Sequence, residues 1–173
     1  VGAVLDLARD LKATQPWPPW LAGRVVALIF ERPSTRTRVS FESGIARLGG
    51  TPMVLAGRDL QMGRGETIED TARVLSCMVD AVVLRTGDHA NLVQLAEGAD
   101  VPVVNGLTYD HHPCQALADA QTLRERFGDL AGLKVAYVGD GNNVFSSLMI
   151  MAGLTGIDLA CACPPGYEPD AAL

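Results

Sequence analysis

One stretch of the sequence marks the point where a buried strand gives way to a helix: Phe30-Glu31-Arg32-Pro33-Ser34-Thr35-Arg36-Thr37-Arg38-Val39-Ser40-Phe41-Glu42. The short apolar run before it, residues 25–30, is typical of a buried strand. After it, apolar residues follow the spacing of one helix face as far as Gly49-Gly50, which is a typical helix end. We therefore predict a helix over residues 35–48 with Ser34 as its N-cap.

The start of this predicted helix favours an anion. The first N–H groups of a helix have no partner within it and lie at the positive end of its dipole. Ser34, Thr35 and Thr37 add hydroxyls, and Arg36 adds a guanidinium. Such serines and threonines often cap helices without binding a ligand. However, basic residues in a first turn are unfavourable unless an anion offsets them, so the stretch predicts a phosphate site.

The composition restricts the class of protein. The chain has 173 residues, of which 48% are hydrophobic and 20% charged, as in ordinary globular domains. Its net charge of −6 argues against nucleic acid or an anionic membrane surface as the main partner. We see neither an apolar run long enough to span a bilayer nor a secretory leader, and expect a cytoplasmic protein. The four cysteines lack zinc-site spacing, so we expect reduced, mostly buried thiols and no metal.

Short apolar segments alternate with amphipathic ones along the chain. Strands are expected near residues 25–30, 53–55, 81–84, 101–104, 134–138 and 158–162, and helices near 5–12, 35–48, 68–79, 90–96, 113–126 and 144–152. This alternation predicts an α/β fold in which a parallel sheet is flanked by helices. We expect one domain over 1–130 and the incomplete start of a second α/β domain over 131–173, because two strands alone cannot bury a sheet.

Polar residues follow several of the predicted strands. In parallel α/β sheets, ligands collect beyond the carboxyl ends of the strands, so these residues are expected around one crevice. Arg85 could instead form a surface ion pair, and His112 could simply cap a helix. Proline is common at the first position of a helix, and Pro113 is expected there in the helix over residues 113–126. Cys114 is discounted as a nucleophile acting with His112, because adjacent residues point in different directions on a helix.

Taken together, the motifs resemble the aspartate/ornithine carbamoyltransferase family, and most closely its ornithine-using members. The resemblance covers nearly the whole chain and is highly specific because the motifs occur in order. They are Ser34-Thr35-Arg36-Thr37-Arg38, Gln61-Met62-Gly63-Arg64-Gly65-Glu66, His112-Pro113-Cys114-Gln115 and Gly139-Asp140-Gly141-Asn142-Asn143.

The resemblance implies a role for each matching residue. The phosphate of carbamoyl phosphate would be bound by Ser34, Thr35, Arg36 and Thr37. Its carbamoyl end would be bound by Arg85, His112 and Gln115, with Pro113 and Cys114 lining the same pocket. Gln61 would reach carbamoyl phosphate from a loop near a subunit boundary, and Asn143 would contact L-ornithine. The catalytic residues would be Arg36, Arg85 and His112.

The resemblance also implies a reaction and an assembly. The carbamoyl group would pass to the side-chain amine of L-ornithine, giving L-citrulline and phosphate, as in arginine biosynthesis or a urea-cycle-type step. The unit would be a homotrimer that needs no metal or organic cofactor. Arg32 stands where such enzymes often have lysine, Gly87 where an aromatic residue is frequent, and Ser146 where histidine is frequent.

Two alternatives stay open. The family's ornithine-binding Asp and Ser-Met pair, its Cys in a His-Cys-Leu-Pro segment and its late Arg are absent from these 173 residues. The chain could therefore be a carbamoyl phosphate-binding module without turnover. It could also belong to a sister transcarbamoylase acting on another amine, although the neutral pair Asn142-Asn143 argues against aspartate, whose carboxylates need a cation.

Overall fold

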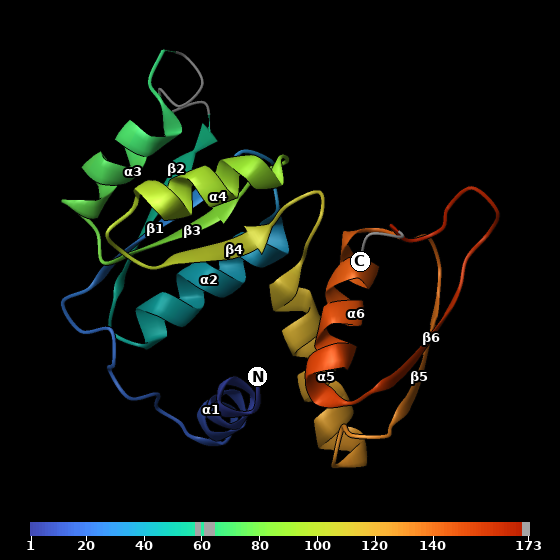
Figure 1. The fold of residues 1–173 in the computed structure, drawn as a ribbon. Helices are drawn as coiled ribbons and strands as arrows, with labels where there is room; N and C mark the ends of the chain where they lie inside the picture. The colour runs from blue at the N-terminus through green and yellow to red at the C-terminus, as the bar shows by residue number, and fades with distance from the viewer. Residues whose placement is uncertain (58–59, 61–64, 171–173) are drawn as a thin grey trace. The chain divides into compact units, whose positions relative to one another are not determined.

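The computed structural model of the chain describes residues 1–57, 60 and 65–170 (Figure 1). Its helices are α1 (Gly2–Ala13), α2 (Thr35–Arg47), α3 (Ile68–Ser76), α4 (His89–Gly98), α5 (Pro113–Phe127) and α6 (Asn143–Thr155). Its strands are β1 (Val25–Phe30), β2 (Thr51–Ala56), β3 (Ala81–Arg85), β4 (Val103–Leu107), β5 (Lys134–Val138) and β6 (Asp158–Ala162). Among the helices of these residues, none has the length and apolar character that a membrane crossing requires.

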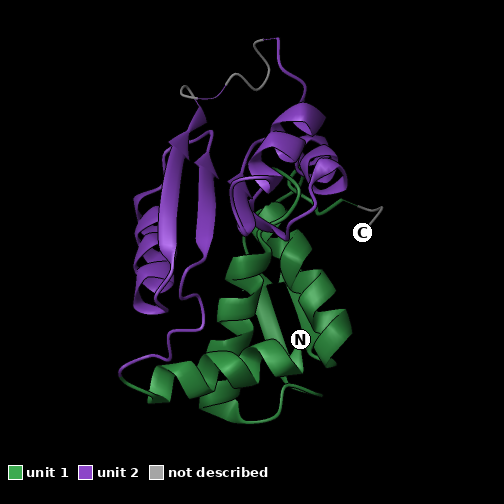
Figure 2. Cartoon of the chain, turned by 90° about the vertical axis from the view of Figure 1, so that its left-hand side faces the viewer, with its two compact units in different colours: residues 1–15, 109–173 green, residues 16–108 purple. Residues whose placement is uncertain are grey.

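The chain divides into two compact units, shown in different colours in Figure 2. Unit 1 contains residues 1–15 and 109–173, and unit 2 contains residues 16–108. Helix α1 therefore belongs with the later part of the chain, where it contacts α5. The division into compact units does not test the expected domain boundary near residue 130, which stays a prediction.

Unit 2 is a four-stranded parallel sheet in the order β2-β1-β3-β4, with helices on both faces. Alternate residues of β1 point to opposite faces. Ala27 and Ile29 pack with α3 and α4, whereas Val26, Leu28 and Phe30 pack with Ile45 of α2. Burial on both faces explains why β1 reads as a continuous apolar run. The predicted α/β fold with a helix-flanked parallel sheet is confirmed, and its carboxyl edge brings the ends of β1 and β3 side by side.

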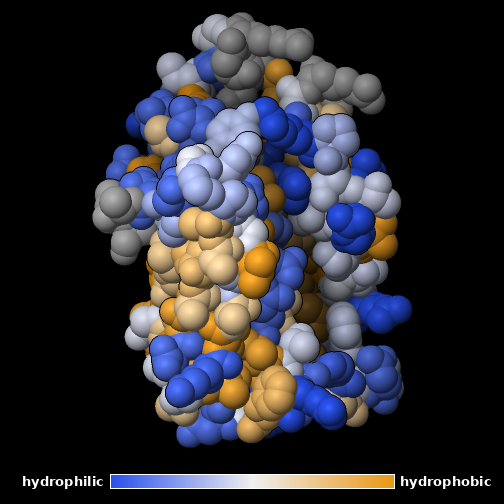
Figure 3. Space-filling model, turned by 90° about the vertical axis from the view of Figure 1, so that its right-hand side faces the viewer, coloured by the Kyte–Doolittle hydropathy of each residue, from blue (hydrophilic) through white to orange (hydrophobic). Residues whose placement is uncertain are grey.

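Unit 1 contains the parallel pair β5-β6 with α1, α5 and α6 packed together. The helices meet through Leu5, Ala116, Ala120 and Met151. Every second residue of β5 is exposed, and Val138 is 82% exposed. Figure 3 looks at the side on which β5 and β6 lie in Figure 1, and apolar side chains gather there. Two strands leave one face of their sheet uncovered, as the sequence suggested.

The structure corrects three local expectations. Strand β4 covers Val103–Leu107 rather than residues 101–104, because Asn105 and Leu107 continue the pairing with β3 on either side of Gly106. Helix α3 ends at Ser76 rather than at residue 79. The cysteines are free, but they are not mostly buried: Cys77 and Cys161 are exposed, and Cys114 and Cys163 are partly exposed.

Candidate functional site

The predicted phosphate site lies at the start of α2, directly after β1. Ser34 has the extended backbone of an N-cap residue (φ −155°, ψ 99°), as predicted. Its side chain does not cap the helix, however, and its Oγ donates instead to Oγ1 of Thr37 at 2.9 Å. The N–H groups of the first turn are thus left to other acceptors.

Thr37 joins this helix start to the end of β3. Arg85, the last residue of β3, pairs in register with Phe30 of β1. Its Nη1 donates to Thr37 Oγ1 at 3.1 Å. A threonine hydroxyl has two acceptor positions and one proton. The Ser34 hydroxyl and the Arg85 guanidinium therefore meet at the same oxygen.

Arg85 is held in an environment that suits an anion. Burial lowers the pKa of its guanidinium below the ordinary arginine value. Its Nε is buried and has no hydrogen-bond partner among the described residues. Within the same residues, no carboxylate forms an ion pair with Arg85. A desolvated cation of this kind is stabilised when an anion binds beside it.

The other arginines of the motif differ from Arg85. Arg36 is exposed and forms no ion pair with any described residue. Arg38 is bound by Glu42, whose Oε2 accepts from its Nε at 3.1 Å. Arg36 is therefore the one of the two that is available to an incoming anion.

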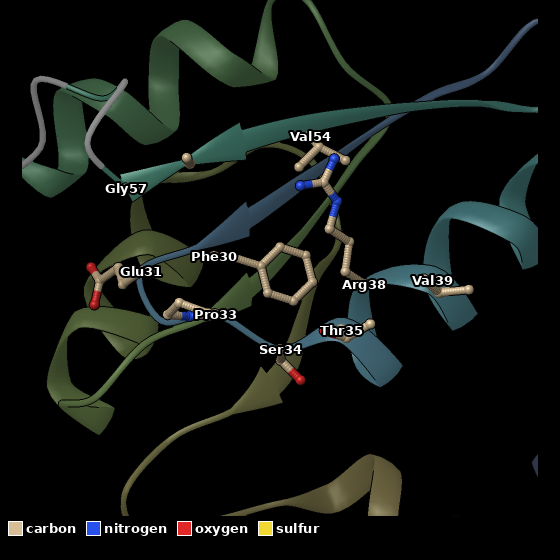
Figure 4. A pocket seen from close by; sticks show the side chains of 10 residues that line it. Phe30, Glu31, Pro33, Ser34, Thr35, Arg38, Val39, Val54 and Gly57 are labelled. Carbon is tan, nitrogen blue, oxygen red and sulfur yellow. The ribbon is translucent and has the colours of Figure 1, made fainter.

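A hollow of about 540 Å³ lies next to this helix start (Figure 4). Ser34 and Thr35 form part of its wall, but Thr37, Arg36 and Arg85 do not. The full lining is Phe30, Glu31, Pro33, Ser34, Thr35, Arg38, Val39, Val54, Ala56 and Gly57. The predicted anion position therefore adjoins this hollow rather than filling it.

The remaining predicted residues belong to unit 1, at the start of α5. His112 occupies the N-cap position and Pro113 the first helical position, as expected. The backbone N–H of His112 donates to Ser147 Oγ of α6 at 2.7 Å. Burial raises the pKa of the Cys114 thiol, which argues further against a nucleophilic role. Gln115 is exposed, and its Nε2 donates to Asp119 Oδ1 at 2.9 Å.

A second hollow, of about 400 Å³, lies within unit 1 at the start of α6. It is lined by Tyr109, Asp110, His111, Gly141, Asn142, Asn143, Ser146 and Asp170. The structure separates the roles of its two asparagines. Asn142 is the N-cap, because its Oδ1 accepts from the N–H groups of Val144 and Phe145. Asn143 is the first helical residue and lies on the wall of the hollow.

The predicted residues thus fall into two groups. Ser34, Thr37 and Arg85 are brought together in unit 2 by direct hydrogen bonds. His112, Pro113, Cys114, Gln115 and Asn143 lie in unit 1. Gln61 lies outside the described residues. The described part of the chain contains no group of three or more His, Cys, Asp or Glu side chains that could hold a metal.

Sequence reasoning missed one contact beside the site. Thr86 Oγ1 donates to Glu31 Oε2 at 2.5 Å, across 55 positions of the sequence. Glu31 is the first residue beyond β1 and Thr86 the first beyond β3. The signal that could have indicated this contact is that each of the two residues directly follows one of two neighbouring strands.

Comparison with known protein families gives two matches along the chain. Residues 1–125 match the carbamoyl-P binding domain of aspartate/ornithine carbamoyltransferase. Residues 131–173 match the Asp/Orn binding domain of the same family. The two matches together cover nearly the whole sequence.

Individual relatives agree with these matches. An ornithine carbamoyltransferase of Carboxydothermus hydrogenoformans is 56% identical over 170 residues, which cover 96% of this chain and 55% of that protein. The enzyme of Bacillus subtilis is 54% identical over 168 residues, covering 97% of this chain and 52% of that protein. The chain thus spans about half the length of the curated relatives it matches.

Solved structures show the same fold. The ornithine carbamoyltransferase of Pyrococcus furiosus has a TM-score of 0.94 at 52% identity, over 98% of this chain and 55% of that one. That of Thermus thermophilus has a TM-score of 0.94 at 46% identity, over 99% of this chain and 60% of that one.

Proposed function

Since this chain belongs to the aspartate/ornithine carbamoyltransferase family, we propose that it carries the carbamoyl phosphate site of an ornithine carbamoyltransferase. The reaction moves the carbamoyl group from carbamoyl phosphate to the side-chain amine of L-ornithine and yields L-citrulline and phosphate. This is a step of arginine biosynthesis or of a urea-cycle-type pathway.

The observation that carries the proposal is the double acceptance by Thr37 Oγ1 from Ser34 and Arg85. It brings two hydroxyls, a desolvated guanidinium and the first turn of α2 together. Each of these groups favours negative charge. In this proposal Ser34, Thr35, Arg36 and Thr37 bind the phosphate, which is also the leaving group.

The chemistry requires donors at the carbonyl oxygen. When the amine attacks the carbamoyl carbon, negative charge grows on this oxygen, and we assign Arg85 and His112 to it. Removing one such donor lowers the rate by roughly 10²–10³ in comparable sites. Gln115 completes the contacts to the carbamoyl end, Pro113 and Cys114 line the pocket, and Gln61 also contributes to binding carbamoyl phosphate. An ammonium with a pKa of about 10.4 must lose its proton before it can attack.

The remaining assignments rest on the resemblance and the matched regions. We propose that residues 1–130 form the carbamoyl phosphate-binding domain and that 131–173 belong to the ornithine-binding domain, where Asn143 contacts the amino acid. We also propose that the enzyme is a homotrimer in the cytoplasm. Free cysteines are compatible with a reducing compartment.

Isothermal titration calorimetry with fresh carbamoyl phosphate tests the site. Arg36→Ala is expected to weaken binding by about 10- to 100-fold, since a hydrogen bond to a charged group contributes roughly 1.5–3 kcal/mol. Arg9→Ala is the matched control, because Arg9 is an exposed arginine of α1 that pairs with Asp6 and Asp10. Equal affinities for the unmodified chain and Arg36→Ala would contradict the assignment of the phosphate site.

A further inference from the structure

The ends of β1 and β3 are joined by two hydrogen bonds from one residue, Glu31. Its backbone N–H donates to the Arg85 carbonyl at 3.0 Å. Its carboxylate accepts from Thr86 Oγ1 at 2.5 Å. A hydroxyl that donates to a carboxylate forms a charge-assisted bond, which is stronger than a neutral one. Glu31 therefore holds both Arg85 and the residue that follows it.

Thr86 is fixed from two directions. Its side chain is bonded to Glu31, and its backbone N–H donates to the Leu107 carbonyl at the end of β4, at 3.1 Å. Thr86 is only 1% exposed, so water cannot replace a lost partner of its hydroxyl. The peptide group between Arg85 and Thr86 thus has a defined orientation, because both its carbonyl and its N–H are hydrogen-bonded.

Close packing leaves the neighbouring backbone little room to adjust. The pairing of β3 with β4 shifts register between Leu84 and Arg85, which leaves Gly106 of β4 as the extra residue of a bulge. A Cβ on Gly106 would lie 3.2 Å from the Leu84 carbonyl oxygen. A Cβ on Gly57 would lie 3.1 Å from the Cα of Glu31. Glycine at both places lets the chain segments approach as closely as the bonds of Glu31 require.

We infer that Glu31 and Thr86 are positioning residues for Arg85. Their hydrogen bond sets the direction in which the Arg85 side chain leaves the sheet, and so keeps its Nη1 on Thr37. Neither residue needs to touch the substrate. This inference rests on the proposed function, because Arg85 is the carbamoyl phosphate ligand through which the two residues act.

A double-mutant cycle tests this role in the 173-residue chain, with carbamoyl phosphate affinity measured by calorimetry. Thr86→Val keeps the shape of the side chain and removes its hydroxyl, whereas Thr86→Ser keeps the hydroxyl. We expect Thr86→Val to weaken binding about tenfold and Thr86→Ser to stay within about threefold of the unmodified chain. In an Arg85→Met background, Thr86→Val should change the affinity by less than about twofold, because no guanidinium is left to position.

The possible failures are distinguishable. If Arg85→Met binds as tightly as the unmodified chain, the proposed function and this inference both fall. If Arg85→Met binds weakly but Thr86→Val does not, or if Thr86→Val weakens binding equally in both backgrounds, only the positioning role is overturned. Thermal unfolding verifies that each variant is folded. Should Thr86→Val not fold, Glu31→Met, which removes the acceptor at the exposed end of the bond, carries the same cycle, and unchanged affinity there overturns the inference.

Discussion

Thr37 accepts hydrogen bonds from Ser34 on its own helix and from Arg85 on β3, and this pair of contacts makes the site more than a helix start. The motif alone predicted hydroxyls and a guanidinium around an anion. It could not predict which hydroxyl meets Arg85, because that depends on two strands lying next to each other. Ser34 occupies the predicted N-cap position, and its hydroxyl bonds to Thr37 rather than to an N–H of the first turn.

Replacing Thr37 tests the contact. Thr37→Val removes both acceptor positions and the proton, so we expect carbamoyl phosphate affinity to fall by about tenfold or more. Thr37→Ser preserves the hydroxyl and should stay within about threefold of the unmodified chain. Calorimetry measures both, and an affinity of Thr37→Val equal to that of the unmodified chain would contradict the role of the hydroxyl.

Cys114 provides a second prediction at this scale. Burial raises the pKa of its thiol, so the reactive thiolate forms only at a higher pH than for an ordinary cysteine. Iodoacetamide should therefore label exposed Cys77 well before Cys114, and the labelling of Cys114 should keep rising into more alkaline solution. Peptide mass spectrometry measures both rates. Labelling of Cys114 first, near neutral pH, would restore it as a candidate nucleophile.

At the scale of elements, short-range patterns predicted the position of most helices and strands. Periodicity placed β1, β5 and β6 with their observed bounds, because their apolar runs are bounded by turn residues. Thr67 caps α3, because its side chain accepts from the N–H of Asp70. The shift of β4 was not predictable, since Asn105 and Leu107 extend the strand past Gly106 only because the neighbouring β3 lies against them.

Asp80 gives a pH-dependent test of how β1 begins. The Val25 N–H and Arg24 donate to its carboxylate, and these hydrogen bonds lower its pKa in the folded chain. Its contribution to stability is present above the unfolded-state pKa and is lost as the pH falls through the lower, folded pKa. Asp80→Asn should therefore lower stability at neutral pH and reduce the loss on acidification. Urea unfolding across acidic pH measures this, and parallel curves for both proteins would contradict it.

The cap of α6 can be tested in the same way. Asn142→Ala removes the acceptor of two N–H groups and should lower the free energy of unfolding by about 1 kcal/mol. Asn142→Ser retains a capping oxygen and should lose only a fraction of this. Urea unfolding compares the two, and equal losses would show that the cap bond is not the cause.

At the scale of the whole molecule, the chain consists of two units whose strands are covered to different extents. The sheet of unit 2 is buried on both faces, whereas β5 and β6 leave an apolar face exposed. Unit 2 contains the joined residues of the proposed phosphate site, and Asn143 lies in unit 1. The chain spans about half the length of the relatives it matches.

We therefore predict that this chain binds carbamoyl phosphate but forms no citrulline from carbamoyl phosphate and ornithine. A colorimetric citrulline assay, run beside the calorimetric titration, measures both properties in one preparation. Citrulline formation that disappears in Arg85→Met would refute this expectation and would show that the 173 residues suffice for turnover.

By itself, the sequence determined the alternation of strands and helices, the parallel α/β class and the anion-favouring start of α2, because hydrophobic period and helix-end chemistry are local properties. Only the tertiary structure decided that Arg85 meets Thr37, 48 positions away, and that Glu31 meets Thr86, 55 positions away. These contacts depend on the strand order β2-β1-β3-β4, which places the ends of β1 and β3 side by side. Strand order follows from the packing of the whole sheet, and no local pattern encodes it.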